Sequence, residues 1–207
     1  MMTTAISGRV LLLSSDDEPL SSIEHELTAA GYDVRRCHEA GGQAFPCQGL
    51  AGGTCPLEAE GGVDVAVDVR QHPWPHPTLR EVGVICALRA DVPLLVIGRH
   101  AHPFEPWATA TLEQADGIAA RCEQAIDSAL ERARVAVVDA VRAVFANHGF
   151  EGSFAVDVQR RLGRLYVTIA ADVPSSVRGM AATRSADALR KLDHTATALE
   201  IEFVELV

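Results

Sequence analysis

Lysine is almost absent from this chain: of its 18 basic residues, only Lys191 is a lysine and the others are arginines. A site whose chemistry requires an amine therefore has a single candidate. The chain also carries 28 acidic residues, which gives a formal net charge of -10. This acidic balance excludes general binding to nucleic acid or to an anionic membrane, because both need a basic surface. We therefore expect no DNA partner.

Long apolar runs and the common catalytic signatures are missing as well. No stretch reaches the roughly 18 apolar residues that span a bilayer, and the first residues lack the features of a secretory signal. These absences predict a cytoplasmic protein with no membrane partner. The chain has no GxSxG, GxxxxGK or GxGxxG motif, and no nucleophile–base pair is readable from its spacing. The sequence therefore favours a protein that is not an enzyme.

What the chain does contain is an alternation of short apolar runs with amphipathic stretches. Strands that alternate with helices indicate an α/β domain with a parallel sheet. In the second predicted helix, Leu79, Val82 and Cys86 mark the expected apolar stripe, and we expect Cys86 and Cys122 to be core residues. The patterns predict strands at 9–14, 32–37, 63–70, 93–98 and 117–120, and helices at 20–30, 77–90, 105–114 and 123–147.

The last sixty residues follow a different pattern. Alternating apolar residues predict a hairpin of strands at 154–159 and 165–171, followed by a helix at 176–192 and a strand at 199–206. This is a small α+β module, which we place at 133–207 after a first domain at 1–132. Sheets of this kind often pair through an open edge, so the module is expected to make a homodimer.

Two adjacent carboxylates, Asp16 and Asp17, stand at the end of the first predicted strand. Like charges repel, and burial penalises both of them, so a cation usually compensates such a pair. The alternative is a structural role, because aspartates are also favoured at the positive N-terminal end of a helix.

Three motifs give this pair a context: SDDEPL, AAGYDV and VAVDVR. Together they resemble the bacterial response-regulator receiver domain, over residues 9 to about 132. The resemblance implies a doubly wound parallel sheet of five strands in the order 2-1-3-4-5. It also implies that Asp16 and Asp17 hold Mg²⁺, and that Asp68 is the phosphoacceptor.

The chain departs from the receiver pattern at three places. Gly98 stands where the motif PLLVIG should end in a hydroxyl residue, and a glycine cannot bond a phosphoryl oxygen. Arg121, in TLEQADGIAARC, replaces the family's lysine as the candidate phosphate contact, although a planar guanidinium is not a compact point charge. A Gly- and Cys-rich loop at 38–62 replaces the helix after the second strand.

These departures predict a degenerate receiver, or pseudo-receiver. The expected function is that of a non-enzymatic regulatory or signalling protein that binds a protein partner or a ligand. A response regulator that accepts phosphate at Asp68 remains an alternative.

Three cysteines fall close together at Cys37, Cys47 and Cys55, separated by nine and seven residues. The spacing matches no common metal motif. In a doubly wound sheet, however, ligands bind beyond the carboxyl ends of the strands, where Cys37 and the two His-Pro turns (QHPWPHP and RHAHP) are expected. The candidate ligands are Cys37, Cys47, Cys55, His38, His72 and His76.

Thiolates with an imidazole suit Zn²⁺ or an iron–sulfur cluster, which makes a metal or redox sensor the second functional hypothesis. A further alternative is that two of the thiols form a regulatory disulfide. The structural alternative is that these cysteines pack as small apolar groups.

Overall fold

The computed structural model describes residues 8–16, 20–38, 42–59, 62–161, 164–192 and 199–206. Asp17, one half of the acidic pair, lies outside the described residues. The chain divides into two compact units, Met1–Ile126 and Asp127–Val207. In the described part of the chain, no helix combines the length and the apolar character that crossing a bilayer requires.

The first unit is built on a five-stranded sheet in which every neighbouring pair of strands is parallel. The strand order is β2-β1-β3-β4-β5, which confirms both the predicted α/β class and the predicted order. Doubly wound folds of several families share this order, so it defines an architecture and not a family. The strands are β1 (Gly8–Ser14), β2 (Tyr32–Arg35), β3 (Val65–Val69), β4 (Leu94–Ile97) and β5 (Ala110–Leu112).

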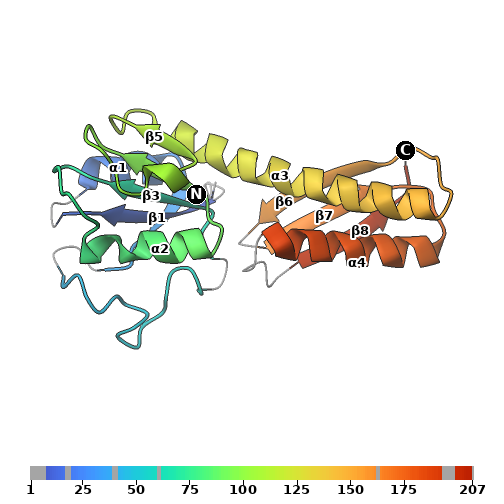
Figure 1. Cartoon of the computed structure of the whole chain (residues 1–207), viewed down its shortest axis with the longest axis horizontal. Coiled ribbons are helices and arrows are strands. Elements are labelled where there is room, and N and C mark those ends of the chain that lie inside the picture. The colour runs from blue at the N-terminus through green and yellow to red at the C-terminus, as the bar shows by residue number, and fades with distance from the viewer. Residues whose placement is uncertain are drawn as a thin grey trace, which may run out of the picture. The chain divides into compact units, whose positions relative to one another are not determined.

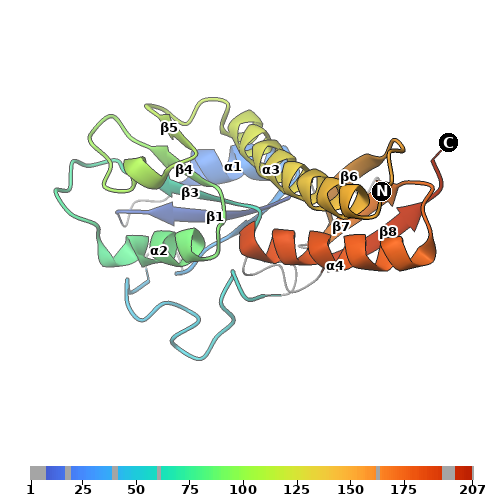
Figure 2. The same cartoon turned by 45° about the vertical axis from the view of Figure 1, so that its right-hand side comes forward.

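Helices cover both faces of this sheet (Figures 1 and 2). Val10 and Leu12 of β1 pack under α1 and the first turns of α3, whereas Leu11 and Leu13 pack under α2. A strand buried on both faces needs apolar residues at every position, which explains why β1 and β4 read as continuous apolar runs. The helices are α1 (Ser21–Ala29), α2 (Val82–Arg89) and α3 (Ile118–Asn147).

The predicted apolar stripe of α2 is wrong. Leu79 and Cys86 are exposed, and the face that packs on the sheet consists of Gly83, Val84 and Ala87. The helix approaches so closely at Gly83 that a Cβ there would lie 2.7 Å from Leu13 Cδ2. Small residues mark the buried side because they allow this contact, so the larger apolar residues are left outside. Residues Leu79–Glu81 form a separate 3₁₀ turn, η1, before α2.

The end of the first unit also differs from the prediction. The helix expected at 105–114 is a single 3₁₀ turn, η2 (Glu105–Trp107), followed by β5. The strand expected at 117–120 is instead the beginning of α3. Gly117 has a φ of 70°, a conformation that glycine adopts without strain, and the helix starts directly after it. Cys122 is fully buried in this helix, as predicted.

The segment between β2 and β3 forms no helix or strand in the residues described, as predicted. It is nevertheless attached to the sheet and to η1. The Gln48 N–H donates to the Cys37 carbonyl at 3.0 Å, and the Arg80 guanidinium donates to the Gly42 carbonyl at 2.6 Å. Figures 1 and 2 show this segment on the far side of α2 from the sheet.

The second unit is the predicted α+β module. The β6–β7 pair is antiparallel and the β7–β8 pair is parallel. One face of the sheet packs against α4 and the second half of α3, around Val137, Phe145 and Ile169. Every second residue of β8 is exposed on the outer face, namely Glu200, Glu202 and Val204. The elements are β6 (Ala155–Arg161), β7 (Arg164–Ala170), α4 (Ser175–Leu192) and β8 (Leu199–Val204).

Candidate functional site

The predicted phosphoacceptor, Asp68, lies inside β3 and is fully buried. It stands between Leu13 of β1 and Val96 of β4 in the sheet register. Burial raises its pKa well above the ordinary aspartate value, and the charge of Glu81 adds to this effect. Neither carboxyl oxygen of Asp68 makes a hydrogen bond to a described residue, and a buried charge without a partner is costly. The geometry therefore favours a neutral carboxylic acid.

A buried ion pair lies beside Asp68. Arg70, the first residue after β3, donates from Nε to Glu81 Oε1 at 2.6 Å and from a terminal nitrogen to Oε2 at 2.8 Å. Glu81 Oε2 also accepts the Thr78 backbone N–H at 2.6 Å. The other Arg70 donors reach the carbonyls of Trp74 and His76, at 2.6 and 2.9 Å. One guanidinium therefore neutralises Glu81 and also holds the His-Pro segment against the sheet.

The fourth member of this buried cluster is His102, from the turn after β4. Its Nδ1 accepts the Phe104 backbone N–H at 3.3 Å, so the proton of the neutral ring lies on Nε2. That nitrogen is 3.4 Å from Asp68 Oδ2. Burial, together with the charge of Arg70, lowers the pKa of His102 to about 4. The ring is therefore neutral at physiological pH.

Ligand atoms of Asp68, Glu81 and His102 all lie within 4.8 Å of one another, the sole group of this kind among the residues described. Two observations argue against a metal ion there. Both oxygens of Glu81 already accept hydrogen bonds from Arg70, and Nε2 of His102 carries a proton where a metal needs a lone pair. Arg70 supplies the positive charge instead. This arrangement is a closed structural cluster that ties the segment after β3 to the sheet.

Gly98, the residue that replaces the receiver hydroxyl, has a packing reason. A Cβ at this position would lie 3.0 Å from the Arg70 carbonyl oxygen and 3.4 Å from Arg70 Cβ. The Arg70 N–H also donates to the Ile97 carbonyl at 2.8 Å, which keeps the two chains together at this point. Glycine at position 98 therefore accommodates the buried arginine.

Asp16 lies at the end of β1, under the His-Pro segment. Its Oδ2 accepts the Ser15 hydroxyl at 2.6 Å, and its Oδ1 accepts Trp74 Nε1–H at 2.7 Å. The Nδ1 atom of His72 is 3.2 Å from Oδ1. Burial alone would raise the pKa of Asp16, but these hydrogen bonds and His72 lower it overall. Protein donors therefore compensate this carboxylate without a bound cation.

The predicted cysteines lie on the α2 side of the sheet. Cys37 is buried in the core with Leu13 and Val84, and Cys47 packs against the same core. Burial, together with the nearby thiols of Cys55, Cys47 and Cys86, raises the pKa of Cys37 to about 12. Cys86 thus joins the three predicted cysteines. All four are free thiols.

The remaining candidates are not brought to one place. His72 contacts Asp16, and His76 is exposed and contributes its carbonyl to Arg70. His38 follows Cys37, and its buried Nε2 has no hydrogen-bond partner. Arg121 lies in the first turn of α3, not at the end of a strand, and donates to Gln124 Oε1 at 3.2 Å. None of the described contacts joins Asp16, Asp68 and Cys37 directly, although Trp74 links Asp16 to Arg70, which lies beside Asp68.

Sequence reasoning missed Arg70, Glu81 and Cys86. Arg70 comes directly after the five residues of β3, which are all buried. A charged residue next to such a strand could have indicated that a buried, oppositely charged partner is present. Thr78 and Glu81 have the spacing of a capping box, which locates the carboxylate at the start of a helix. Cys86 had no local signal, because its partners are distant in the sequence.

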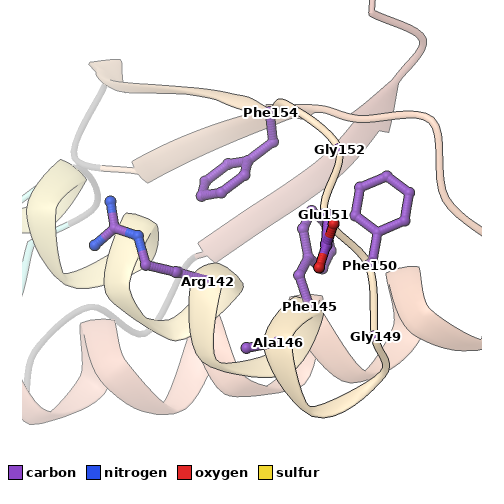
Figure 3. A pocket seen from close by; sticks show the side chains of 8 residues that line it. All are labelled: Arg142, Phe145, Ala146, Gly149, Phe150, Glu151, Gly152 and Phe154. Carbon is purple, nitrogen blue, oxygen red and sulfur yellow. The ribbon is translucent and has the colours of Figure 1, made fainter.

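A hollow of about 350 Å³ lies in the second unit, at the end of α3 (Figure 3). The Phe145 ring contacts Phe150 and Phe154 edge-on, with centroids 5.0 and 5.3 Å apart. The two charged lining residues are exposed, and Arg142 is paired with Asp139 at 2.9 Å. No buried titratable group faces the hollow among the described residues that line it: Arg142, Phe145, Ala146, Gly149, Phe150, Glu151, Gly152 and Phe154.

Comparison of the sequence with protein-family models and with curated proteins finds no match.

Proposed function

We propose that this is a non-enzymatic regulatory protein whose first unit is a receiver-like domain that works without phosphotransfer. The observation that carries the proposal is the complete burial of Asp68, the residue at the phosphoacceptor position. A phosphodonor must reach the carboxylate that it modifies, and a nucleophile must be ionised at the working pH. Burial and a raised pKa oppose both requirements.

Two other positions of the receiver pattern also support the proposal. Gly98 packs against Arg70 in place of a hydroxyl, and protein donors occupy both oxygens of Asp16. Polar groups that would act in phosphotransfer are thus engaged in internal bonds. We therefore assign the carboxyl edge of the sheet around these residues to the binding of a partner.

A protein partner is the proposed occupant of that edge. The loop after β3 exposes a large aromatic side chain there, Trp74 at 49%. The carboxyl edge of a doubly wound sheet is where ligands bind, and exposed tryptophans are typical binding anchors. Trp107, at 62% exposed, is a suitable control because it comes shortly before Thr109, which pairs with Leu94 at the amino end of β4.

The test has two measurements. Incubation with acetyl phosphate and Mg²⁺, followed by intact-mass analysis, should leave the protein unmodified, with Asp68→Asn as the matched control. Stoichiometric phosphorylation that disappears in Asp68→Asn would overturn the proposal. Affinity purification from the native organism should recover a partner with the wild type and with Trp107→Ala, and lose it with Trp74→Ala. Recovery of the same proteins by the wild type and by Trp74→Ala would refute the proposed binding edge.

The second unit is proposed to pair subunits. Its sheet has only three strands, so β6 and β8 are both edge strands, and such edges are ready templates for pairing with another chain. Light scattering on the full chain should give twice the chain mass of 22.1 kDa. A molar mass equal to one chain, over a range of concentrations, would contradict this part of the proposal.

A further inference from the structure

Four thiols from three separate segments meet on the α2 side of the first unit. Cys37 follows β2, Cys47 and Cys55 belong to the segment between β2 and β3, and Cys86 lies on α2. Backbone contacts bring the first two segments together. The residue after Cys47 donates its N–H to the Cys37 carbonyl at 3.0 Å. A Cβ built on Gly49 would lie 3.0 Å from Cys55 Cβ, so Cys55 folds back against the same turn.

The contact with α2 is made at Gly83. A Cβ on this residue would lie 2.9 Å from Cys37 Sγ, which places that sulfur directly against the helix. Cys86 stands three residues further along α2, and residues at this spacing are neighbours on a helix surface. Leu57 packs against the same core, so the chain that follows Cys55 is also held beside α2.

Electrostatic interaction of Cys86 with Cys55 and Cys47, and of Cys37 with the other three thiols, agrees with this placement. Cys122, the fifth cysteine, takes no part: it is buried on the opposite face of the sheet, with α1. The grouping therefore includes four of the five cysteines and omits the one that is simply a core residue.

An all-sulfur donor set selects Zn²⁺ or an iron–sulfur cluster. The two kinds of centre require different distances between the sulfur atoms. Zn–S bonds of about 2.3 Å hold four sulfurs about 3.8 Å apart, whereas no three of these sulfurs all lie within 4.8 Å of one another. A cluster spreads its thiolates over several irons and so accepts a wider spacing.

We propose that Cys37, Cys47, Cys55 and Cys86 form a four-thiolate site that binds an iron–sulfur cluster. A regulatory disulfide fits less well, because Cys37 is only 6% exposed and a buried, protonated thiol is a poor nucleophile for exchange. The cluster would join the Gly-rich segment, the end of β2 and α2.

The test begins with the full chain purified without oxygen. Apo-protein incubated with ferrous iron and sulfide should bind iron and sulfide in equal amounts and acquire visible absorption. Cys86→Ser and Cys47→Ser should each lose most of the bound iron. Cys122→Ala should retain iron at the wild-type level, because that residue lies outside the group. Far-UV circular dichroism reports whether each variant is folded, and Cys86 is exposed, so its replacement by serine should not disturb the core.

Three results would overturn the proposal. If the protein binds one zinc ion per chain and no sulfide, the site holds a single metal ion and not a cluster. A colourless, metal-free protein with reactive thiols after incubation would remove the site. Retention of iron by a folded Cys86→Ser protein, while Cys47→Ser loses it, would refute Cys86 as the fourth ligand.

Discussion

At the scale of single residues, the buried cluster around Arg70 is a balance of charges. Arg70 and Glu81 form an ion pair whose side chains are at most 1% exposed. Burial raises the pKa of Asp68 well above its ordinary value and lowers the pKa of His102 to about 4, so both shifts favour the neutral form. Removing one member of a buried pair leaves the other charge uncompensated, which is far more costly than the pair itself is favourable.

The first prediction concerns that ion pair. Arg70→Met should lower the free energy of unfolding by about 3–5 kcal/mol, because Glu81 stays buried without its cation. Urea unfolding measures the loss. The matched control is Arg134→Met, whose partner Glu131 is 56% exposed; because solvent screens that pair, its loss of stability should be much smaller. Similar losses in the two variants would show that the Arg70 pair is not dehydrated as described.

The second prediction concerns pH. The folded-state pKa of His102 is about 4, below the unfolded value of about 6.5. Between these values the unfolded chain binds more protons, so this group lowers stability as pH falls from 6.5 towards 4. The loss amounts to at most about 3 kcal/mol. His102→Gln, measured by urea unfolding across this range, should have a flatter pH dependence than the wild type. An unchanged slope would exclude His102 as its source.

At the scale of elements, the two helical glycines have opposite surroundings. Gly83 of α2 faces Leu13 Cδ2 at 2.7 Å and Cys37 Sγ at 2.9 Å from an added Cβ, whereas Gly179 of α4 has nothing within 4 Å. The same substitution should therefore have opposite signs in the two helices.

The third prediction follows from this contrast. Gly83→Ala should destabilise the protein by about 1–3 kcal/mol, because the added methyl group overpacks the interface. Gly179→Ala should stabilise it by up to about 1 kcal/mol, since alanine is the better helix former. Thermal unfolding of both variants measures the difference. A stabilising Gly83→Ala would mean that α2 lies further from the sheet than the structure has it.

The same packing explains how much of the fold was predictable. Apolar runs identified β1 and β4, because a strand covered on both faces needs such a run. The face of α2 was not predictable from hydrophobicity, since its contact depends on the small size of Gly83 and Ala87. The position of β5 was missed because a strand of three residues has too little periodicity to detect.

Some residues of the candidate site were also predictable from the sequence, and others were not. Asp16 and Cys37 were identified because their residue types mark chemistry even without a fold. Glu81 was missed because a glutamate near a helix start is usually solvated, and its burial depends on an arginine eleven residues away. Cys86 could be assigned to the thiol group only from the structure, in which α2 contacts Cys37 at Gly83. Long-range packing, which local patterns do not encode, accounts for these omissions.

At the scale of the whole molecule, the chain has two compact units, each with its own core, and α3 belongs in part to both. The first unit contains both tryptophans, Trp74 and Trp107. Tryptophan fluorescence therefore reports the first unit alone, whereas far-UV circular dichroism reports the helices and strands of both. Domains with separate cores are able in principle to unfold separately.

The last prediction uses this separation. Ile169 is fully buried at the centre of the second unit's core, and Ile169→Ala should remove about 2–5 kcal/mol from that core. The midpoint of part of the circular dichroism transition should fall, while the fluorescence midpoint stays at the wild-type value. Val67→Ala in β3, also fully buried, is the matched change in the first unit and should shift the fluorescence midpoint. If Ile169→Ala moves both signals together, α3 transmits the loss and the two units unfold as one.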